Sequence, residues 1–233
     1  MKMPRVAYHM LPEGSIPPTV TVYGAGVRIW HWLNALLVFI LCFTGYFIGT
    51  PWPSSIGDTS ILYSMGWLRF FHLASGYLFA LLALYRFALV FTEGGITHHL
   101  FLPAIWRREW IIGFNRQILW NIFLGRPQRY VGLNPLGGII MLLLYVLPGA
   151  LLILSGFAMY AEVTGHDSWQ YFLFGWVGLF FGNTLDLHVV HRLSMWLVVW
   201  FIGMHVYVAV REDITSRQTV ISTMLSGERQ FRK

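Results

Sequence analysis

The stretch LHVVHRLSMWLVVWFIGMHVYVAV, residues 187–210, has the length and apolarity of a membrane-spanning helix and contains three histidines. A hydrocarbon core of about 30 Å needs roughly 20 mostly apolar residues to cross it as a helix. Three other stretches meet this condition, so we expect four spans, at residues 27–49, 67–91, 136–161 and 187–210. The sequence therefore predicts an all-α integral membrane protein, a four-helix transmembrane bundle that forms a single membrane domain over residues 1–233.

The composition excludes a soluble fold. Of the 233 residues, 56% are hydrophobic and only 11% are charged, whereas soluble domains carry roughly 25% charged residues. The net charge of +6 does not indicate nucleic-acid binding, because 14 of the 16 basic residues are arginines dispersed through an apolar chain. The one cysteine, Cys42, is too few for a disulfide framework, an iron–sulfur cluster or a thiolate zinc site.

The basic residues predict how the spans are oriented. Loops on the cytoplasmic side of a membrane are enriched in Lys and Arg, and 13 of the 16 basic residues lie in residues 1–28, 92–133 and 211–233. The connections 50–66 and 162–186 contain neither Lys nor Arg. We therefore expect a multi-pass protein of the cytoplasmic membrane with both termini in the cytoplasm. Residues 1–26 have no apolar run, so the first span should serve as an uncleaved insertion signal.

Two shorter segments are expected to lie at the membrane surface. Residues 105–124 mix Trp, Ile and Leu with Arg, which is typical of an amphipathic helix on the cytoplasmic surface. Residues 171–185 are apolar but short and lie between Asp167 and Asp186, so we interpret them as an interfacial or re-entrant helix. Within the third span, Pro148 predicts a kink.

Histidine inside a membrane span is costly and points to function. His191 and His205 lie 14 residues apart, so at about 100° per residue they return to nearly the same helix face, about 21 Å apart along the axis. His188 is rotated away from that face. His31 lies near the cytoplasmic end of the first span, at the depth of His205. His72 lies near the outer end of the second span, at the depth of His191.

This arrangement predicts two pairs of facing imidazoles, His72 with His191 near the outside and His31 with His205 near the cytoplasm. Imidazole is an axial ligand of haem iron, and helical bundles build such sites from facing side chains. Zinc or copper would need more ligands at the same depth. A single membrane histidine is more often a hydrogen-bonded packing residue, but the matched depths favour two sites for haem b, with the four histidines as iron ligands.

Nearby glycines and arginines admit two interpretations. Gly45 and Gly76 would let a flat macrocycle approach the backbone, but Gly45 also forms a GxxxG packing motif with Gly49. Five arginines near the ends of the spans would either pair with haem propionates or extend toward the membrane interface: Arg28, Arg69, Arg86, Arg192 and Arg211.

Four segments carry a resemblance to a known family. They are RIWHWLNALLVFILCFTGYFIG at 28–49, MGWLRFFHLASG at 65–76, DLHVVHRLSMW at 186–196 and GMHVY at 203–207. The chain resembles the cytochrome b subunit of membrane-bound nickel–iron hydrogenases. The tail REDITSRQTVISTMLSG at 211–227 favours this family over the related gamma subunits of formate dehydrogenase and over thiosulfate reductase subunits.

The resemblance implies a di-haem anchor, the electron-transfer subunit of a hydrogen:quinone oxidoreductase complex. It would take electrons from the iron–sulfur clusters of the hydrogenase small subunit and pass them through two haems b to quinone. His72 and His191 would hold the haem nearer that subunit. A loose match to the formate dehydrogenase subunits implies that Asn134 contacts quinone. The expected partners are the small and large hydrogenase subunits on the outer face, lipid and quinone, and no nucleic acid.

Two alternatives stay open. A di-haem subunit of formate dehydrogenase, or of another periplasmic reductase, would have the same arrangement of histidines. The catalytic subunit that co-purifies with the chain would distinguish it. A haem-free membrane anchor or assembly protein would show no Soret and α bands in a reduced-minus-oxidised spectrum. A transporter is disfavoured because the sequence shows no inverted repeat.

Overall fold

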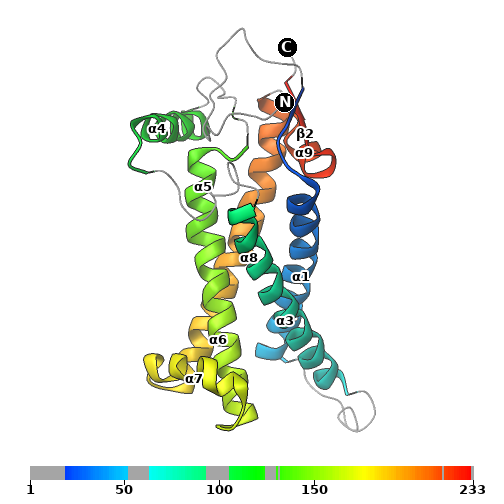
Figure 1. The fold of residues 1–233 in the computed structure, drawn as a ribbon, viewed down its shortest axis with the longest axis vertical. Helices are drawn as coiled ribbons and strands as arrows, with labels where there is room; N and C mark the ends of the chain where they lie inside the picture. Colours follow the sequence, from blue (N-terminus) through cyan, green and yellow to red (C-terminus); the bar gives the residue numbers. More distant parts are fainter. Residues whose placement is uncertain are drawn as a thin grey trace. The chain divides into compact units, whose positions relative to one another are not determined.

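The computed structural model describes residues 19–51, 63–92, 105–123, 130, 132–216 and 218–231. Most of these residues are helical (Figure 1). The elements follow in the order β1 (Thr19–Thr21), α1 (Ala25–Gly49), α3 (Ser64–Thr92), α4 (Arg108–Phe123), α5 (Pro135–Met141), the π-helical segment η2 (Leu142–Val146), α6 (Leu147–Thr164), α7 (Trp169–Phe181), α8 (Thr184–Thr215), α9 (Val220–Ser226) and β2 (Glu228–Gln230).

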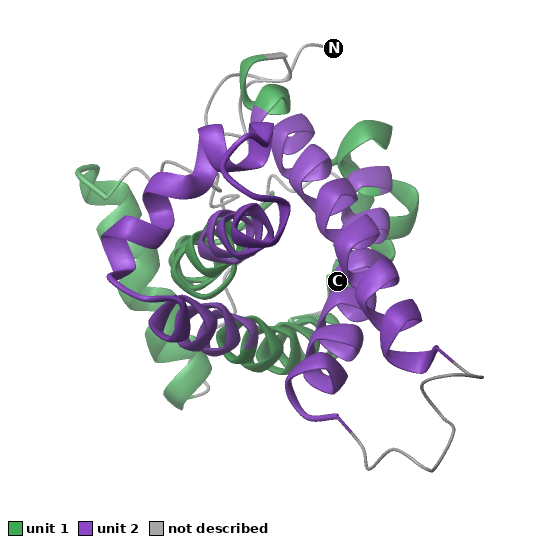
Figure 2. Ribbon diagram, turned by 90° about the horizontal axis from the view of Figure 1, so that it is seen from below, with its two compact units in different colours: residues 1–28, 88–150, 196–233 green, residues 29–87, 151–195 purple. Residues whose placement is uncertain are grey.

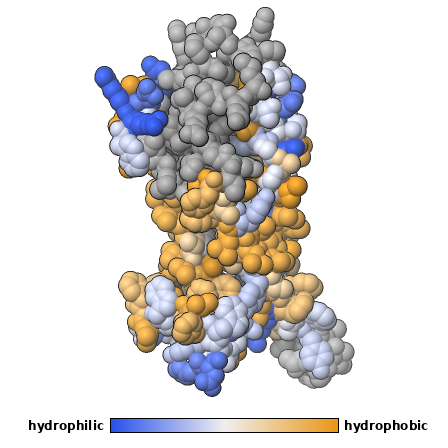
Figure 3. All heavy atoms as spheres, viewed as in Figure 1, coloured by the Kyte–Doolittle hydropathy of each residue, from blue (hydrophilic) through white to orange (hydrophobic). Residues whose placement is uncertain are grey.

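The four predicted spans are confirmed. Helical stretches long and apolar enough to cross a membrane run over Ala25–Gly49, Ser64–Phe91, Pro135–Thr164 and Thr184–Thr215. Each extends a few residues beyond the predicted bounds, because backbone hydrogen bonding continues into flanks that are no longer apolar. Much of the described surface on the face shown in Figure 3 is orange, the colour of hydrophobic residues. Phe39, Leu84 and Leu193 are each more than half exposed, as lipid-facing side chains are.

The chain divides into two compact units, coloured separately in Figure 2, and the division falls within all four spans. Unit 1 comprises residues 1–28, 88–150 and 196–233, and unit 2 comprises residues 29–87 and 151–195. The predicted site residues are shared between them. Unit 2 contains His31, His72 and His191, and unit 1 contains Asn134 and His205.

In unit 1, a small sheet joins the two terminal segments. Strands β1 and β2 pair antiparallel, with Val20 opposite Arg229, and Val22 N donates to the Gly227 carbonyl at 2.8 Å. Gly227 has φ +86°, and a Cβ there would lie 2.6 Å from the Tyr23 carbonyl oxygen, so this turn requires glycine. The sheet could not be predicted from the sequence, because strands of three residues are too short to show a periodic pattern.

Helix α4 lies within the predicted amphipathic segment 105–124, and polar contacts hold its buried face in unit 1. Glu212 of α8, only 9% exposed, accepts hydrogen bonds from Trp120 Nε1 at 2.8 Å and from Gln117 Nε2 at 3.3 Å. Arg211 donates to Asn121 Oδ1 at 2.6 Å, and its guanidinium lies 5.3 Å from the centroid of the Trp120 ring. A buried carboxylate needs such donors to offset its lost hydration.

Tyr130 joins the β2 strand to α4. Arg229 Nη1 donates to the carbonyl of Tyr130 at 2.8 Å, while the Tyr130 hydroxyl donates to the Gly113 carbonyl at 3.3 Å. Burial raises the pKa of Tyr130 to about 12, against the opposing effect of the Arg116 charge. Burial lowers the pKa of the Arg229 guanidinium, although Tyr23 and Glu212 act in the opposite direction.

The kink predicted at Pro148 stays a prediction, and a π-helical turn lies just before this proline. Proline has no N–H, and its ring crowds the carbonyl of the residue four positions earlier, which is Leu144. Leu144 lies inside η2 (Leu142–Val146). The wider π-helical turn therefore absorbs the mismatch immediately before the proline.

In unit 2, α7 packs on the adjoining ends of α6 and α8. Val177 is buried with Ala158 and Leu187, and Gln170 Nε2 donates to the Tyr77 hydroxyl at 3.2 Å. The helix ends at Phe181, because Gly182 turns the chain with φ +79°. The segment predicted as one helix over 171–185 is therefore divided, and its last residues belong to α8.

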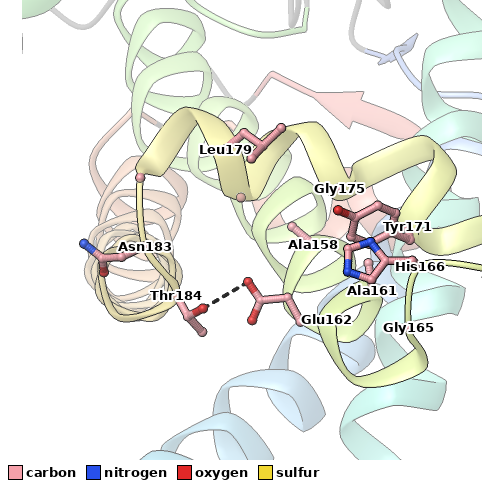
Figure 4. Close-up of a pocket in the computed structure, with 12 residues that line it drawn as sticks. Ala158, Ala161, Glu162, Gly165, His166, Tyr171, Gly175, Leu179, Asn183 and Thr184 are labelled. Carbon is pink, nitrogen blue, oxygen red and sulfur yellow. Dashed lines mark hydrogen bonds between the residues drawn. The ribbon is translucent and has the colours of Figure 1, made fainter.

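A cavity of about 320 Å³ lies beside α7, among small residues of α6 and α7 and polar residues of the α7–α8 turn (Figure 4). Thr184 Oγ1 donates to Glu162 Oε1 at 3.1 Å along one wall. The ring of His166 packs on Tyr171 with centroids 4.1 Å apart. His166 is exposed.

Candidate functional site

Unit 2 brings together two predicted ligands, His72 of α3 and His191 of α8. Their ring centroids lie 6.3 Å apart, and the ring planes meet at 67°. Both side chains are half-buried. A metal–imidazole bond is about 2 Å long, so two imidazoles bound to one ion have centroids separated by about 6 Å once the ring radii are added. The observed spacing fits one metal ion held between the two rings.

A hydroxyl group holds each imidazole at Nδ1. Thr44 Oγ1 of α1 lies 2.9 Å from His72 Nδ1, and Ser155 Oγ of α6 lies 2.8 Å from His191 Nδ1. Thr44 is 4% exposed and Ser155 is 1% exposed. Metal-binding histidines commonly use one ring nitrogen for the metal and the other for a hydrogen bond of this kind. The contacts therefore leave Nε2 of each ring as the nitrogen for a ligand.

A glycine beside each hydroxyl makes room for the same imidazole. A Cβ at Gly45 would lie 3.0 Å from His72 Cε1, and a Cβ at Gly156 would lie 3.3 Å from His191 Cε1. At Gly76, a Cβ would meet no atom within 4 Å. Of these three, Gly156 was missed by the sequence analysis. Its signal is the Ser155–Gly156 dipeptide, which parallels Thr44–Gly45.

Arg192 follows His191 and ties α8 to the end of α1 within unit 2. Its Nη1 donates to the Gly49 carbonyl at 3.3 Å, and its Nη2 donates to Thr50 Oγ1 at 2.9 Å. The two glycines of the GxxxG motif therefore contact different side chains: Gly45 faces His72 and Gly49 faces Arg192. Arg192 places a positive charge one helical turn along α1 from Gly45.

The other predicted ligands, His31 and His205, belong to different units. His31 in unit 2 is half-buried, and its ring meets Trp32 edge-on with centroids 5.1 Å apart. His205 in unit 1 is exposed and stacks on Phe201 with centroids 5.4 Å apart. Phe201 in turn packs against Tyr145. The pairing of His31 with His205 stays a prediction.

Asn134, the predicted quinone contact, is the N-cap of α5 in unit 1. Its Oδ1 accepts a hydrogen bond from Gly137 N at 2.6 Å, and Pro135 occupies the first helical position. Such a cap is worth about 1 kcal/mol. Capping alone explains an asparagine at this position, so the quinone contact stays a prediction.

The remaining histidines have other surroundings. His188 Nδ1 lies 2.8 Å from the carbonyl of Thr184 on its own helix. His9, His98 and His99 fall outside the described residues. Within the part of the chain that the structure describes, no group of three or more His, Cys, Asp or Glu side chains comes together to hold a metal ion. A two-imidazole site is therefore what unit 2 provides.

Known proteins resemble this chain over most of its length. The model of the family described as prokaryotic cytochrome b561 matches residues 22–227. A protein of Rhizobium leguminosarum bv. viciae named "Probable Ni/Fe-hydrogenase B-type cytochrome subunit" is 44% identical, over 92% of this chain and 90% of the relative. A protein of the same name from Azotobacter vinelandii is also 44% identical, over 91% and 89%. The Escherichia coli K12 "Probable Ni/Fe-hydrogenase 1 B-type cytochrome subunit" is 41% identical, over 91% of each chain.

The residues of unit 2 fit haem b. Two imidazoles at a spacing suited to one ion would both ligate a haem iron. The two glycines keep the helix backbones close to those imidazoles without a clash. With the family match over 22–227, the chain belongs to the prokaryotic cytochrome b561 family, and haem b is the cofactor that this membership implies.

Proposed function

We propose that the chain is the b-type cytochrome subunit of a membrane-bound Ni/Fe hydrogenase and that it passes electrons from the hydrogenase subunits to quinone. The observation that carries the proposal is the His72/His191 pair, with centroids 6.3 Å apart and a buried hydroxyl on each Nδ1. The names of the relatives, which describe Ni/Fe-hydrogenase B-type cytochrome subunits, support the same role. Haem b, when bound, supplies one-electron redox chemistry.

The chain's own residues would hold two such groups. His72 and His191 would hold the haem nearer the hydrogenase small subunit, and His31 and His205 the haem nearer the cytoplasm. The 14-residue spacing between His191 and His205 supports this division, because it gives one helix two ligands on nearly the same face, about 21 Å apart.

The proposed protein lies in the cytoplasmic membrane with both termini in the cytoplasm and the hydrogenase small and large subunits on the outer face. The 13 basic residues in 1–28, 92–133 and 211–233 support this orientation. The antiparallel pairing of Thr19–Thr21 with Glu228–Gln230 also supports it, since such pairing needs both tails on the same side of a membrane.

Quinone would accept the electrons near the cytoplasmic end, with Asn134 as a contact. Asn134 lies at the start of the third span. Its Oδ1 is already engaged with Gly137 N, so the amide nitrogen is the group left for a quinone carbonyl. That nitrogen can donate two hydrogen bonds.

The decisive experiment is purification of the chain in mild detergent with whatever it binds, followed by a reduced-minus-oxidised spectrum and a haem-to-protein ratio. We expect Soret and α bands, a ratio of about two haems per chain, co-purified hydrogenase subunits, and hydrogen-dependent quinone reduction. Co-purification of a formate dehydrogenase instead would favour the alternative partner. Absence of both bands would contradict the proposal and favour a haem-free anchor.

A further inference from the structure

The same two-residue arrangement occurs twice in unit 2, on different helices. Thr44 and Gly45 of α1 meet His72, and Ser155 and Gly156 of α6 meet His191. In each case the hydroxyl contacts Nδ1 and the adjacent glycine lies beside Cε1 of the same ring. The glycine lets the helix come close enough for the hydroxyl to reach the nitrogen.

Each hydroxyl also contacts a carbonyl of its own helix. Thr44 Oγ1 donates to the Ile40 carbonyl at 2.7 Å, and Ser155 Oγ donates to the Leu151 carbonyl at 2.5 Å. A carbonyl oxygen only accepts hydrogen bonds, and a hydroxyl has one proton to donate. The proton of each hydroxyl is therefore committed to the backbone.

That commitment determines the direction of the other hydrogen bond. A hydroxyl whose proton is already used can only accept from the imidazole, so Nδ1 must carry the hydrogen. In a neutral imidazole, one nitrogen carries the hydrogen and the other keeps the lone pair. The lone pair is therefore on Nε2.

We propose that Thr44 and Ser155 are positioning residues that fix the tautomers of His72 and His191, with hydrogen on Nδ1 and the lone pair of Nε2 kept for haem iron. The proposal rests on the proposed haem site at these two histidines. A partner at Nδ1 also raises the basicity of the ligating nitrogen. The hydroxyls thus orient the ligands and strengthen their bond to the ferric state.

The test compares variants that lose the hydroxyl with variants that keep it, in the membrane complex with its partner subunits. Thr44→Val and Ser155→Ala remove the oxygen, while Thr44→Ser and Ser155→Thr retain it. We expect each hydroxyl-free variant to bind haem about 10- to 100-fold more weakly. The midpoint potential of one haem should rise, because a less basic imidazole stabilises the ferric state less, and its low-temperature EPR signal should shift.

The matched control is Thr215→Val. Thr215 Oγ1 donates to the Arg211 carbonyl at 2.6 Å, four residues earlier on α8, which is the same backbone contact that Thr44 makes. Thr215→Val and Thr44→Ser should keep the wild-type haem affinity, potential and EPR signal. Ser155→Thr should keep the potential and the EPR signal, while its added methyl group overpacks a buried position. A general effect of removing a helix hydroxyl would alter Thr215→Val as well, and that result would contradict the proposal.

The outcomes separate this proposal from the proposed function. Wild-type affinity, potential and EPR signal in both hydroxyl-free variants would overturn it while leaving the haem site intact. An equal loss in Thr44→Ser and Thr44→Val would also overturn it. If His72→Ala and His191→Ala retain both haems, the site itself is wrong and both proposals fail. If Thr44→Val does not accumulate in membranes, Ser155→Ala, which removes a single oxygen atom, decides the question.

Discussion

The two units use buried polar groups in different ways. In unit 2, the hydroxyls of Thr44 and Ser155 hold two histidines, each of which keeps Nε2 for a ligand. In unit 1, Glu212 accepts hydrogen bonds from Trp120 and Gln117, and Arg229 donates to backbone carbonyls. In these unit 1 hydrogen bonds, both the donor and the acceptor belong to the protein.

The buried polar groups of unit 2 are therefore arranged for a cofactor, and those of unit 1 for the fold. Substitutions at the His72/His191 pair should act on haem binding, and should lower the free energy of unfolding only by the stabilisation that bound haem supplies. Substitutions in the unit 1 network should do the reverse, because they leave buried donors without acceptors.

The largest effect is expected from His191→Ala in unit 2. Loss of one axial imidazole should remove one haem, so the haem-to-protein ratio should fall to about half that of wild type under the two-haem proposal. Absorbance of the pyridine haemochrome measures this ratio. His188→Ala is the control, because His188 contacts a carbonyl of its own helix. An unchanged ratio in His191→Ala would break the contrast.

In unit 1, Glu212→Ala should lower the free energy of unfolding. It leaves the Trp120 and Gln117 donors unsatisfied in a buried site, at a cost of about 1–3 kcal/mol each. Thermal unfolding in detergent measures the loss, and the haem-to-protein ratio should stay at the wild-type value. Glu212→Gln retains one acceptor oxygen and should lose less. Equal losses in the two variants would contradict the role assigned to the carboxylate oxygen.

Glycine substitutions test the close approach in unit 2. Gly45→Ala should weaken haem binding and cost about 1–3 kcal/mol by overpacking, because the new Cβ would lie 3.0 Å from His72 Cε1. Gly156→Ala, at 3.3 Å from His191 Cε1, should have a smaller effect. Gly76→Ala is the control, since its Cβ would meet no atom within 4 Å. A larger loss in Gly76→Ala than in Gly45→Ala would contradict this ranking.

Substitution of Asn134 separates capping from quinone contact. Asn134→Ala removes the cap of α5 and should cost about 1 kcal/mol of stability. Asn134→Ser keeps a capping oxygen but loses the amide nitrogen. If the amide contacts quinone, Asn134→Ser should keep wild-type stability while the KM for quinone rises. A wild-type KM would leave Asn134 as a helix cap.

At neutral pH the smallest effect is expected from Tyr130 in unit 1, because its titration changes stability only at alkaline pH. The pKa of Tyr130 is raised to about 12 in the folded chain, against about 10 in an unfolded one. Its contribution to stability is therefore complete below pH 10 and is lost as the pH rises from 10 to 12. Unfolding measured across this range should show wild type losing more stability than Tyr130→Phe. Parallel curves would show that the phenol does not titrate in this way.

Sequence reasoning predicted most of the fold and part of the site. The four spans follow from apolar length, and the shared face of His191 and His205 follows from helical period. Neither signal reports which helix a given face meets. From the sequence, the proximity of His72 and His191 is an inference from depth, and the structure places their rings 6.3 Å apart. The pairing of His31 with His205 is still an inference from depth.

The sequence alone predicted four membrane-crossing helices, two histidine pairs matched by depth and the loops in which positive charge collects, because apolar length, helical period and loop charge can be read along the chain. Only the tertiary structure selected Thr44–Gly45 and Ser155–Gly156 as the dipeptides that meet histidines. A Ser or Thr followed by Gly occurs five times in the chain, so the dipeptide alone does not identify the site. The choice was made by packing between helices, which brings together residues 28 and 36 positions apart.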